Sequence, residues 1–156
     1  MNLPLTLLKI YSGSHNTKLQ DKFKLGSFIS GKVGQEFRWG INDCNTFFIE
    51  LHDKLYGTDD LKRVKQQYIN KKTAIKFLKN LGLTPAQWLH IRNYSQIKGK
   101  KDWQDGDVLT IQHKIYASVY VYFDGAFWTV PEEQTMRGYH PDSFTNVTYT
   151  GWRKNG

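Results

Sequence analysis

The spacing of apolar residues changes at about residue 103, and no other feature of the sequence constrains the fold as strongly. Before this point, apolar residues recur at the period of amphipathic helices. Beyond it, short segments rich in β-branched and aromatic residues alternate between apolar and polar positions, as strands do. Helices that precede strands, without regular alternation of the two, predict an α+β fold with N-terminal helices followed by an antiparallel β-meander.

The helix that the sequence defines best follows Asn42 and Asp43. Either residue can cap its first turn, because the side-chain oxygen accepts backbone N–H groups that have no partner within the helix. Gly57 is expected to end this helix in the left-handed conformation that glycine adopts easily. The other predicted helices are 17–30 with an interruption at Gly26, a lysine-rich region from 59 to 81, and a short helix that starts at Thr84-Pro85.

The predicted strands are bounded by turn residues. Asp124-Gly125 is a strong signal for a tight hairpin turn, because both positions of such a turn favour residues that tolerate positive φ. Pro131 ends the strand after it. No repeat or linker divides the chain, so we expect an arm over 1–16 and a single domain over 17–156. The predicted strands are 108–111, 115–123, 126–130 and 147–152.

The composition excludes several classes of protein. A single cysteine allows no intramolecular disulfide and no C4 or C2H2 zinc site. The five histidines have no metal-ligand spacing, so we expect neither a metal nor a cofactor. No apolar run approaches the ~20 residues of a membrane span. The apolar start lacks the basic region and cleavage site of a signal peptide, so neither feature is expected.

The chain is basic, with a formal net charge of +8. Such a charge favours anionic partners, but the lysines are spread out, as on a solvated helix surface. Nucleic acid is not an expected partner, because the sequence contains no RNP motif, helix-turn-helix signature or zinc finger. A basic binding module for wall polymer or DNA stays open as an alternative function.

Cys44 is the main candidate for chemistry, as a nucleophile. In the first turn of a helix, unpaired N–H groups and the helix dipole are expected to lower the pKa of its thiol. A catalytic cysteine also needs a base, usually a histidine, that a third polar group orients. The alternative is a packing role, because Cys44 lies on the same helical stripe as Phe47 and Leu51.

Two motifs carry a family resemblance. The segment 37–44 (FRWGINDC), followed by an aromatic-rich helix, resembles the nucleophile motif of the NlpC/p60 superfamily, and 105–109 (DGDVL) resembles the Gly-Asp strand start of that superfamily. Its members are papain-like cysteine peptidases that cut peptidoglycan stem peptides. The closing part, from Gly138 to Trp152-Arg153, is most similar to a phage-encoded branch of unknown function. The supporting motif residues are Trp39, Gly40, Asp43, Gly106 and Asp107.

This resemblance implies a papain-like fold over about residues 19–153, but a broken catalytic triad. When the Asp124-Gly125 turn fixes the register, the position of the catalytic histidine falls on Ala117, which cannot accept a proton. The orienting position falls on Thr129, which then has no imidazole to orient.

Two other histidines are candidates for the missing base. His113 lies four residues before Ala117, which on a strand corresponds to a displacement of roughly 13 Å, and its ordinary interpretation is a solvent-exposed turn residue. His140 is a weaker candidate that would have to fold back over the site.

Three functions are considered. The first, whose virion setting is what the resemblance implies, is a phage tail-associated virion protein, made in the host cytoplasm, with a hydrolase-like fold and a degraded triad. Its partners would be other tail proteins and peptidoglycan, and it would act structurally or in cell-wall engagement. The second is an active thiol endopeptidase that cuts peptidoglycan stem peptides when a phage enters its host. The third is the basic binding module.

Overall fold

The computed structural model describes residues 14–82, 84–99 and 102–156. Residues 1–13 of the predicted arm lie outside the described residues, and 14–16 form the start of a helix. Within the described residues, the helices are α2 (Ser14–Lys32), α3 (Cys44–Tyr56), α4 (Leu61–Val64), α5 (Lys71–Leu81) and α6 (Pro85–Ile91). The strands are β1 (Tyr94–Gln96), β2 (Val108–Gln112), β3 (Ala117–Phe123), β4 (Ala126–Thr129), β5 (Arg137–Tyr139) and β6 (Thr150–Lys154), with a 3-10 helix η1 (Pro141–Phe144) before β6.

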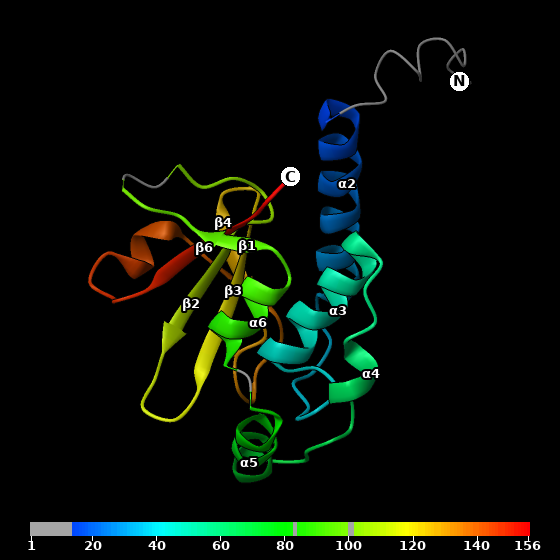
Figure 1. Cartoon of the computed structure of the whole chain (residues 1–156), viewed down its shortest axis with the longest axis vertical. Coiled ribbons are helices and arrows are strands. Elements are labelled where there is room, and N and C mark those ends of the chain that lie inside the picture. The colour runs from blue at the N-terminus through cyan, green and yellow to red at the C-terminus, as the bar shows by residue number, and fades with distance from the viewer. Residues whose placement is uncertain (1–13, 83, 100–101) are drawn as a thin grey trace.

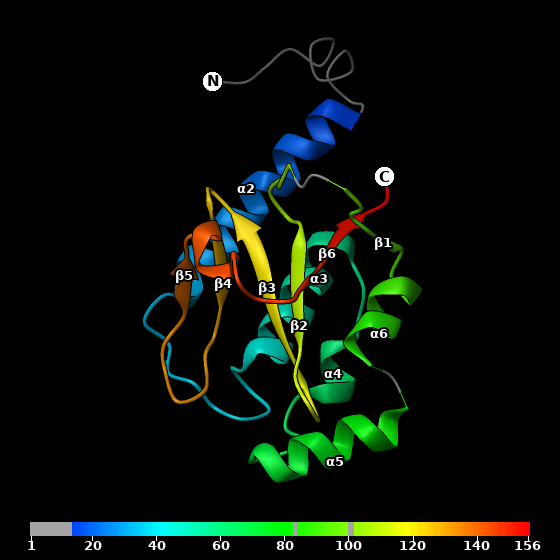
Figure 2. The same cartoon turned by 90° about the vertical axis from the view of Figure 1, so that its left-hand side faces the viewer.

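The predicted α+β class is confirmed, since the helices come first and the paired strands form an antiparallel sheet. The sheet order is β1-β6-β2-β3-β4-β5. The strands β2 to β5 follow one another as a meander, whereas β6 inserts between β1 and β2. Figures 1 and 2 show α2 and α3 on one face of the sheet, and α5 beyond the hairpin end of β2 and β3.

Two helix predictions need correction. Gly26 does not interrupt the first helix, which runs unbroken through it. A Cβ at this position would lie 2.8 Å from the Cζ atom of Phe123, so glycine lets α2 approach β3 closely. The lysine-rich region is two helices, α4 and α5, because Asn70 caps a new helix and accepts the N–H of Thr73.

The core lies between the helices and one face of the sheet. Phe47 and Leu51 of α3 pack against Val119 and Val121 of β3, and all four side chains are buried. This packing explains why the stripe on the Cys44 helix is apolar. The opposite face of the sheet has its own aromatic cluster, which η1 helps to cover: Leu109, Phe127 and Phe144 form its buried part.

Candidate functional site

Cys44 is the first residue of α3, and Asp43 is the cap that fixes this helix start. Asp43 Oδ1 accepts the N–H groups of Asn45 (3.0 Å) and Thr46 (2.9 Å), and the Thr46 hydroxyl accepts the N–H of Asp43 in return. This reciprocal pair is a capping box. The other carboxylate oxygen of Asp43 accepts the Tyr68 hydroxyl, at 2.8 Å. The buried Asp43 therefore holds together the chain around the cysteine.

Gly40 and Trp39 position the turn that leads into this helix. Gly40 has φ +76°, and a Cβ there would collide with the carbonyl oxygen of Tyr68. Its N–H donates to Asp43 at 2.8 Å. Trp39 packs edge-on against Phe37, with ring centroids 4.9 Å apart, and lies against the buried cluster that contains Tyr68. The turn residues of the first motif thus have a structural role.

Asp107 of the second motif ties the strand region together. It is buried, and Arg153 donates to both of its carboxylate oxygens, from Nε at 2.9 Å and from a terminal nitrogen at 2.7 Å. Gln104 donates its backbone N–H to the same group at 2.8 Å. Gly106 adopts φ +92° beside it. The contact between Asp107 and Arg153 therefore fixes β6 beside β2.

The thiol of Cys44 is not activated by its position. Burial of the sulfur, and then the neighbouring Asp43 carboxylate, raise its pKa to about 12. Hydrogen bonds from the backbone at Val119 and Asn45 act in the opposite direction but are outweighed. The expectation that the helix start lowers the pKa of this thiol is therefore wrong. Burial disfavours the thiolate, and the capping carboxylate adds a negative charge where the helix end would have stabilised one.

A cavity of about 250 Å³ lies beside Cys44. Ala117, the residue on which the resemblance places the catalytic histidine position, is part of the lining. Among the side chains that the structure describes, which begin at residue 21, no imidazole is hydrogen-bonded to the Cys44 sulfur. Helix α5, the hairpin between β2 and β3, and the end of β4 complete the wall; they contribute Lys71, Leu78, His113, Tyr116, Ser118 and Thr129, among others.

His113 lines this same cavity, but its ring is engaged elsewhere. Its Nε2 forms a 2.8 Å hydrogen bond with the hydroxyl of Ser118, and its ring stacks on Tyr116 with centroids 4.5 Å apart. His113 is half-buried, so its interpretation as a solvent-exposed turn residue is wrong. Ser118 was missed from the sequence, although the hairpin that joins β2 to β3 brings residues 113 and 118 near each other.

The two remaining candidates, Thr129 and His140, form hydrogen bonds with other groups. Thr129 is buried and donates its hydroxyl to the carbonyl of Val119 on the neighbouring strand, at 2.8 Å. His140 is exposed and caps η1, since its Nδ1 accepts the N–H of Asp142 at 3.1 Å. The cavity wall beside Cys44 contains Thr129 but not His140.

Residues 17–143 match a family described as "Domain of unknown function (DUF6950)". The chain belongs to this family. No curated protein matches it. The DUF6950 match runs from α2 to η1, so it contains Cys44, its cavity and Asp107, but not Arg153.

Two further properties bear on this DUF6950 domain. The residues that the structure describes contain no group of three or more histidine, cysteine, aspartate or glutamate side chains that could hold a metal ion. Among the same residues, no helix is long and apolar enough to cross a membrane.

Proposed function

We propose that this protein is a phage tail-associated virion protein that uses an NlpC/p60-like cavity to engage the cell wall without cleaving it. The observation that carries the proposal is the state of Cys44. Desolvation and the neighbouring Asp43 carboxylate raise its pKa to about 12, and Ala117 lines the cavity where a base is needed. The phage setting rests on the resemblance of the two motifs and of the closing Trp152-Arg153 segment.

The raised pKa has a direct consequence for thiol chemistry. The thiolate is the nucleophilic form of cysteine. Because the pKa of Cys44 is raised far above neutral pH, its thiol is almost entirely protonated at pH 7. A catalytic base would compensate by removing the proton during attack, but the bond from His113 goes to Ser118. The cavity is therefore better suited to holding a peptide than to cutting one.

The proposal is tested by separating binding from cleavage on purified peptidoglycan. The chain is incubated with intact sacculi, the bound fraction is measured by sedimentation, and released peptides are measured in the supernatant. We expect binding without release, and the same binding for Cys44→Ala. Release of stem-peptide fragments by the wild type but not by Cys44→Ala would overturn the proposal. Failure to sediment with sacculi would remove the cell-wall role.

An active cysteine peptidase is the second candidate, because His113 lines the same cavity as Cys44. The His113 ring would have to rotate away from Ser118 before it could accept the proton of the Cys44 thiol. Alkylation of Cys44 by iodoacetamide distinguishes the two candidates. Rapid labelling near neutral pH, lost in His113→Gln, indicates an active pair. Labelling that is slow and unaffected by this substitution indicates an inert thiol.

The net charge of +8 keeps the basic binding module as a third candidate. Such binding depends on released counterions, so its affinity falls steeply with salt. Sedimentation with sacculi, and binding to duplex DNA, are therefore measured across salt concentrations. Wall binding that persists at high salt favours recognition in the cavity over attraction between charges.

A further inference from the structure

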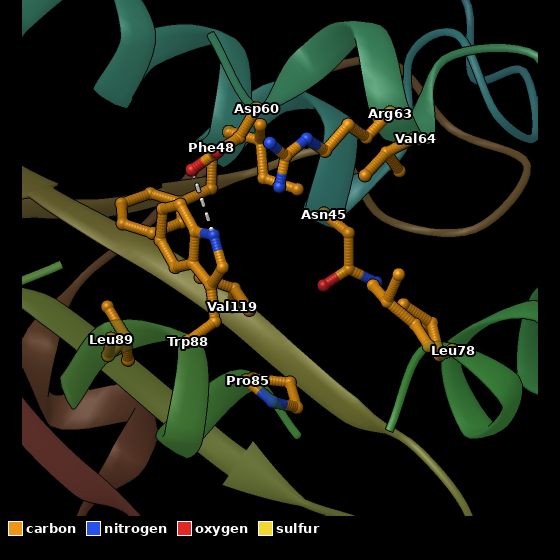
Figure 3. Close-up of a pocket in the computed structure, with 12 residues that line it drawn as sticks. Asn45, Phe48, Asp60, Arg63, Val64, Leu78, Pro85, Trp88, Leu89 and Val119 are labelled. Carbon is orange, nitrogen blue, oxygen red and sulfur yellow. Dashed lines mark hydrogen bonds between the residues drawn. The ribbon is translucent and has the colours of Figure 1, made fainter. Parts of the chain in front are cut away.

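A second hollow lies next to the Cys44 cavity, where α3, α4, α5 and α6 converge on β3. Figure 3 shows it, and its volume is about 110 Å³. Its wall is mainly apolar and includes Phe48, Val64, Leu78, Trp88 and Val119. An apolar cavity of about 150 Å³ accommodates benzene. The hollow, called the four-helix pocket below, thus has room for one apolar side chain of roughly the size of valine or leucine.

Apolar surface is left in water at the edge of this pocket. Leu81, which lines it from the end of α5, is 43% exposed. Phe48 and Val64, deeper in the wall, are buried. A ligand whose apolar group fills the pocket would cover the exposed part of Leu81.

The two charged side chains at the pocket, Asp60 and Arg63, differ in whether their charge has a partner. Arg92 and Trp88 Nε1 both donate to the Asp60 carboxylate, so its charge is already compensated. The guanidinium of Arg63 forms no ion pair or hydrogen bond with any part of the chain that the structure describes. Figure 3 shows its side chain extending over the pocket. The uncompensated charge at this site is therefore positive, and it favours a carboxylate.

Asn45 connects the pocket with the Cys44 cavity. It lines both hollows, as does Leu78. Its side-chain amide has no hydrogen-bond partner within 14–82, 84–99 and 102–156, and Figure 3 shows it pointing into the pocket. An amide of this kind both donates and accepts, so it can pair with the C=O and N–H of a peptide bond.

From these three features we infer that the four-helix pocket binds the C-terminus of a partner polypeptide that ends in an apolar residue of about the size of valine or leucine. The terminal side chain fills the pocket, the α-carboxylate pairs with Arg63, and the last peptide bond pairs with Asn45. The preceding residues continue into the cavity beside Cys44, which has room for them. A free fatty acid would use the pocket and Arg63 but would leave Asn45 and the second cavity unused.

Binding of short peptides to the full chain tests this inference. The reference probe is acetyl-Gly-Ser-Gly-Ser-Leu with a free C-terminus. Its C-terminal amide and a version ending in serine are the matched probes, and hexanoate represents the fatty acid. Dissociation constants come from NMR titration of the ¹⁵N-labelled chain, in which the Asn45 side-chain amide reports occupancy directly.

We expect the amide and the serine-ended peptide each to bind about tenfold more weakly than the reference. The Arg63→Gln variant should bind the reference peptide more weakly by a similar factor. It should also bind the peptide with a free C-terminus and its C-terminal amide with equal affinity. Lys65→Gln removes the same charge from an exposed residue that does not line the pocket, and should change nothing.

Several results would overturn the inference: equal binding of acid and amide, equal effects of Arg63→Gln and Lys65→Gln, hexanoate binding as tightly as the peptide, or no binding of the reference peptide. None of them decides whether the chain sediments with sacculi, so the inference and the proposed cell-wall role can fail separately.

Discussion

Asp43 forms the cap of the helix that begins at Cys44, and the same carboxylate stands beside the thiol. Its hydrogen bonds to Asn45, Thr46 and Tyr68 make it indispensable for the local structure. Its negative charge also helps to raise the pKa of Cys44, after the larger effect of burial. A residue that builds the helix start thereby removes the advantage that a helix start gives to a thiol.

The substitution Asp43→Asn separates these two effects. The amide oxygen can still accept helix N–H groups, but the amide nitrogen cannot accept from Gly40 and Tyr68, so we expect a loss of about 1–3 kcal/mol in stability. Without the negative charge, the pKa of Cys44 should fall while remaining above its usual value, because the sulfur stays buried. The pH profile of iodoacetamide labelling measures this shift. Asp59→Asn, at an exposed acid, should leave the profile unchanged, and an unaltered profile in Asp43→Asn would contradict the assigned cause.

The buried carboxylate of Asp107 should be among the most sensitive positions in the strand region. Asp107→Ala leaves Arg153 without its partner and the N–H of Gln104 without its acceptor. Because the Arg153 side chain is 37% exposed and can be hydrated, we expect a loss of about 1–3 kcal/mol, from the hydrogen bonds that the buried end of the pair no longer makes. Lys62→Ala breaks an exposed pair with Asp59 and should cost less than about 1 kcal/mol. Urea denaturation of both variants measures the difference, and similar losses would argue against a structural role for Asp107.

The sequence was sufficient to predict the elements with strong local signals. The stop at Gly57 and the turn at Asp124-Gly125 are confirmed, with φ +71° at Gly57 and φ +50° and +80° in the turn, and of the two predicted caps, Asn42 and Asp43, the structure selects Asp43. Strands β1 and β5 have three residues each, which is too short for an alternating pattern to be recognised. The place of β6 between β1 and β2 depends on long-range contacts, such as that of Arg153, which no local pattern encodes.

The candidate site was predictable as a location but not in its electrostatics. The sequence placed Cys44 at a helix start, and the family resemblance put Ala117 at the histidine position; the structure brings both to one cavity. The sequence did not reveal that burial outweighs the effect of the helix dipole on the pKa of Cys44, because desolvation depends on which side chains surround the sulfur. The hydrogen bond between His113 and Ser118 also depends on the geometry of a hairpin, which spacing alone does not fix.

His52 should make the fold sensitive to mild acid. It is 1% exposed and its Nδ1 lies 3.0 Å from the Tyr94 hydroxyl. Burial lowers its pKa to about 4, below the ordinary value of 6.5. The unfolded chain therefore binds a proton at His52 more readily than the folded chain does. The contribution of the neutral His52 to the free energy of unfolding is complete above pH 6.5, and roughly 3 kcal/mol of it is lost as the pH falls to about 4.

Urea denaturation at several pH values measures this loss, and His52→Phe provides the control. That variant is expected to be less stable at pH 7, because Tyr94 loses its partner, but its stability should change less between pH 6.5 and 4. The pKa of Asp60 is held below its usual value of 3.8 by the bonds from Arg92, although burial alone would raise it. The contribution of Asp60 to stability is therefore lost at lower pH than that of His52. An equally steep loss in His52→Phe would show that other groups are responsible.

The two glycines within α2 should respond in opposite ways to alanine. Alanine favours a helix interior over glycine by about 0.5–1 kcal/mol. A Cβ at Gly31 meets nothing within 4 Å, so Gly31→Ala should raise the stability of the fold by this amount. A Cβ at Gly26 would lie 2.8 Å from the Phe123 ring, which packs against the core, so Gly26→Ala should lose stability as the ring is displaced.

Thermal unfolding of the two variants compares them directly, and the double substitution Gly26→Ala with Phe123→Leu identifies the cause. A shorter side chain at position 123 gives the new methyl group room, so Gly26→Ala should be less harmful in the Phe123→Leu background than in the wild type. Equal gains at Gly26 and Gly31 would mean that α2 does not press on β3 at this point. The inferred close packing of α2 against β3 at Gly26 would then be wrong.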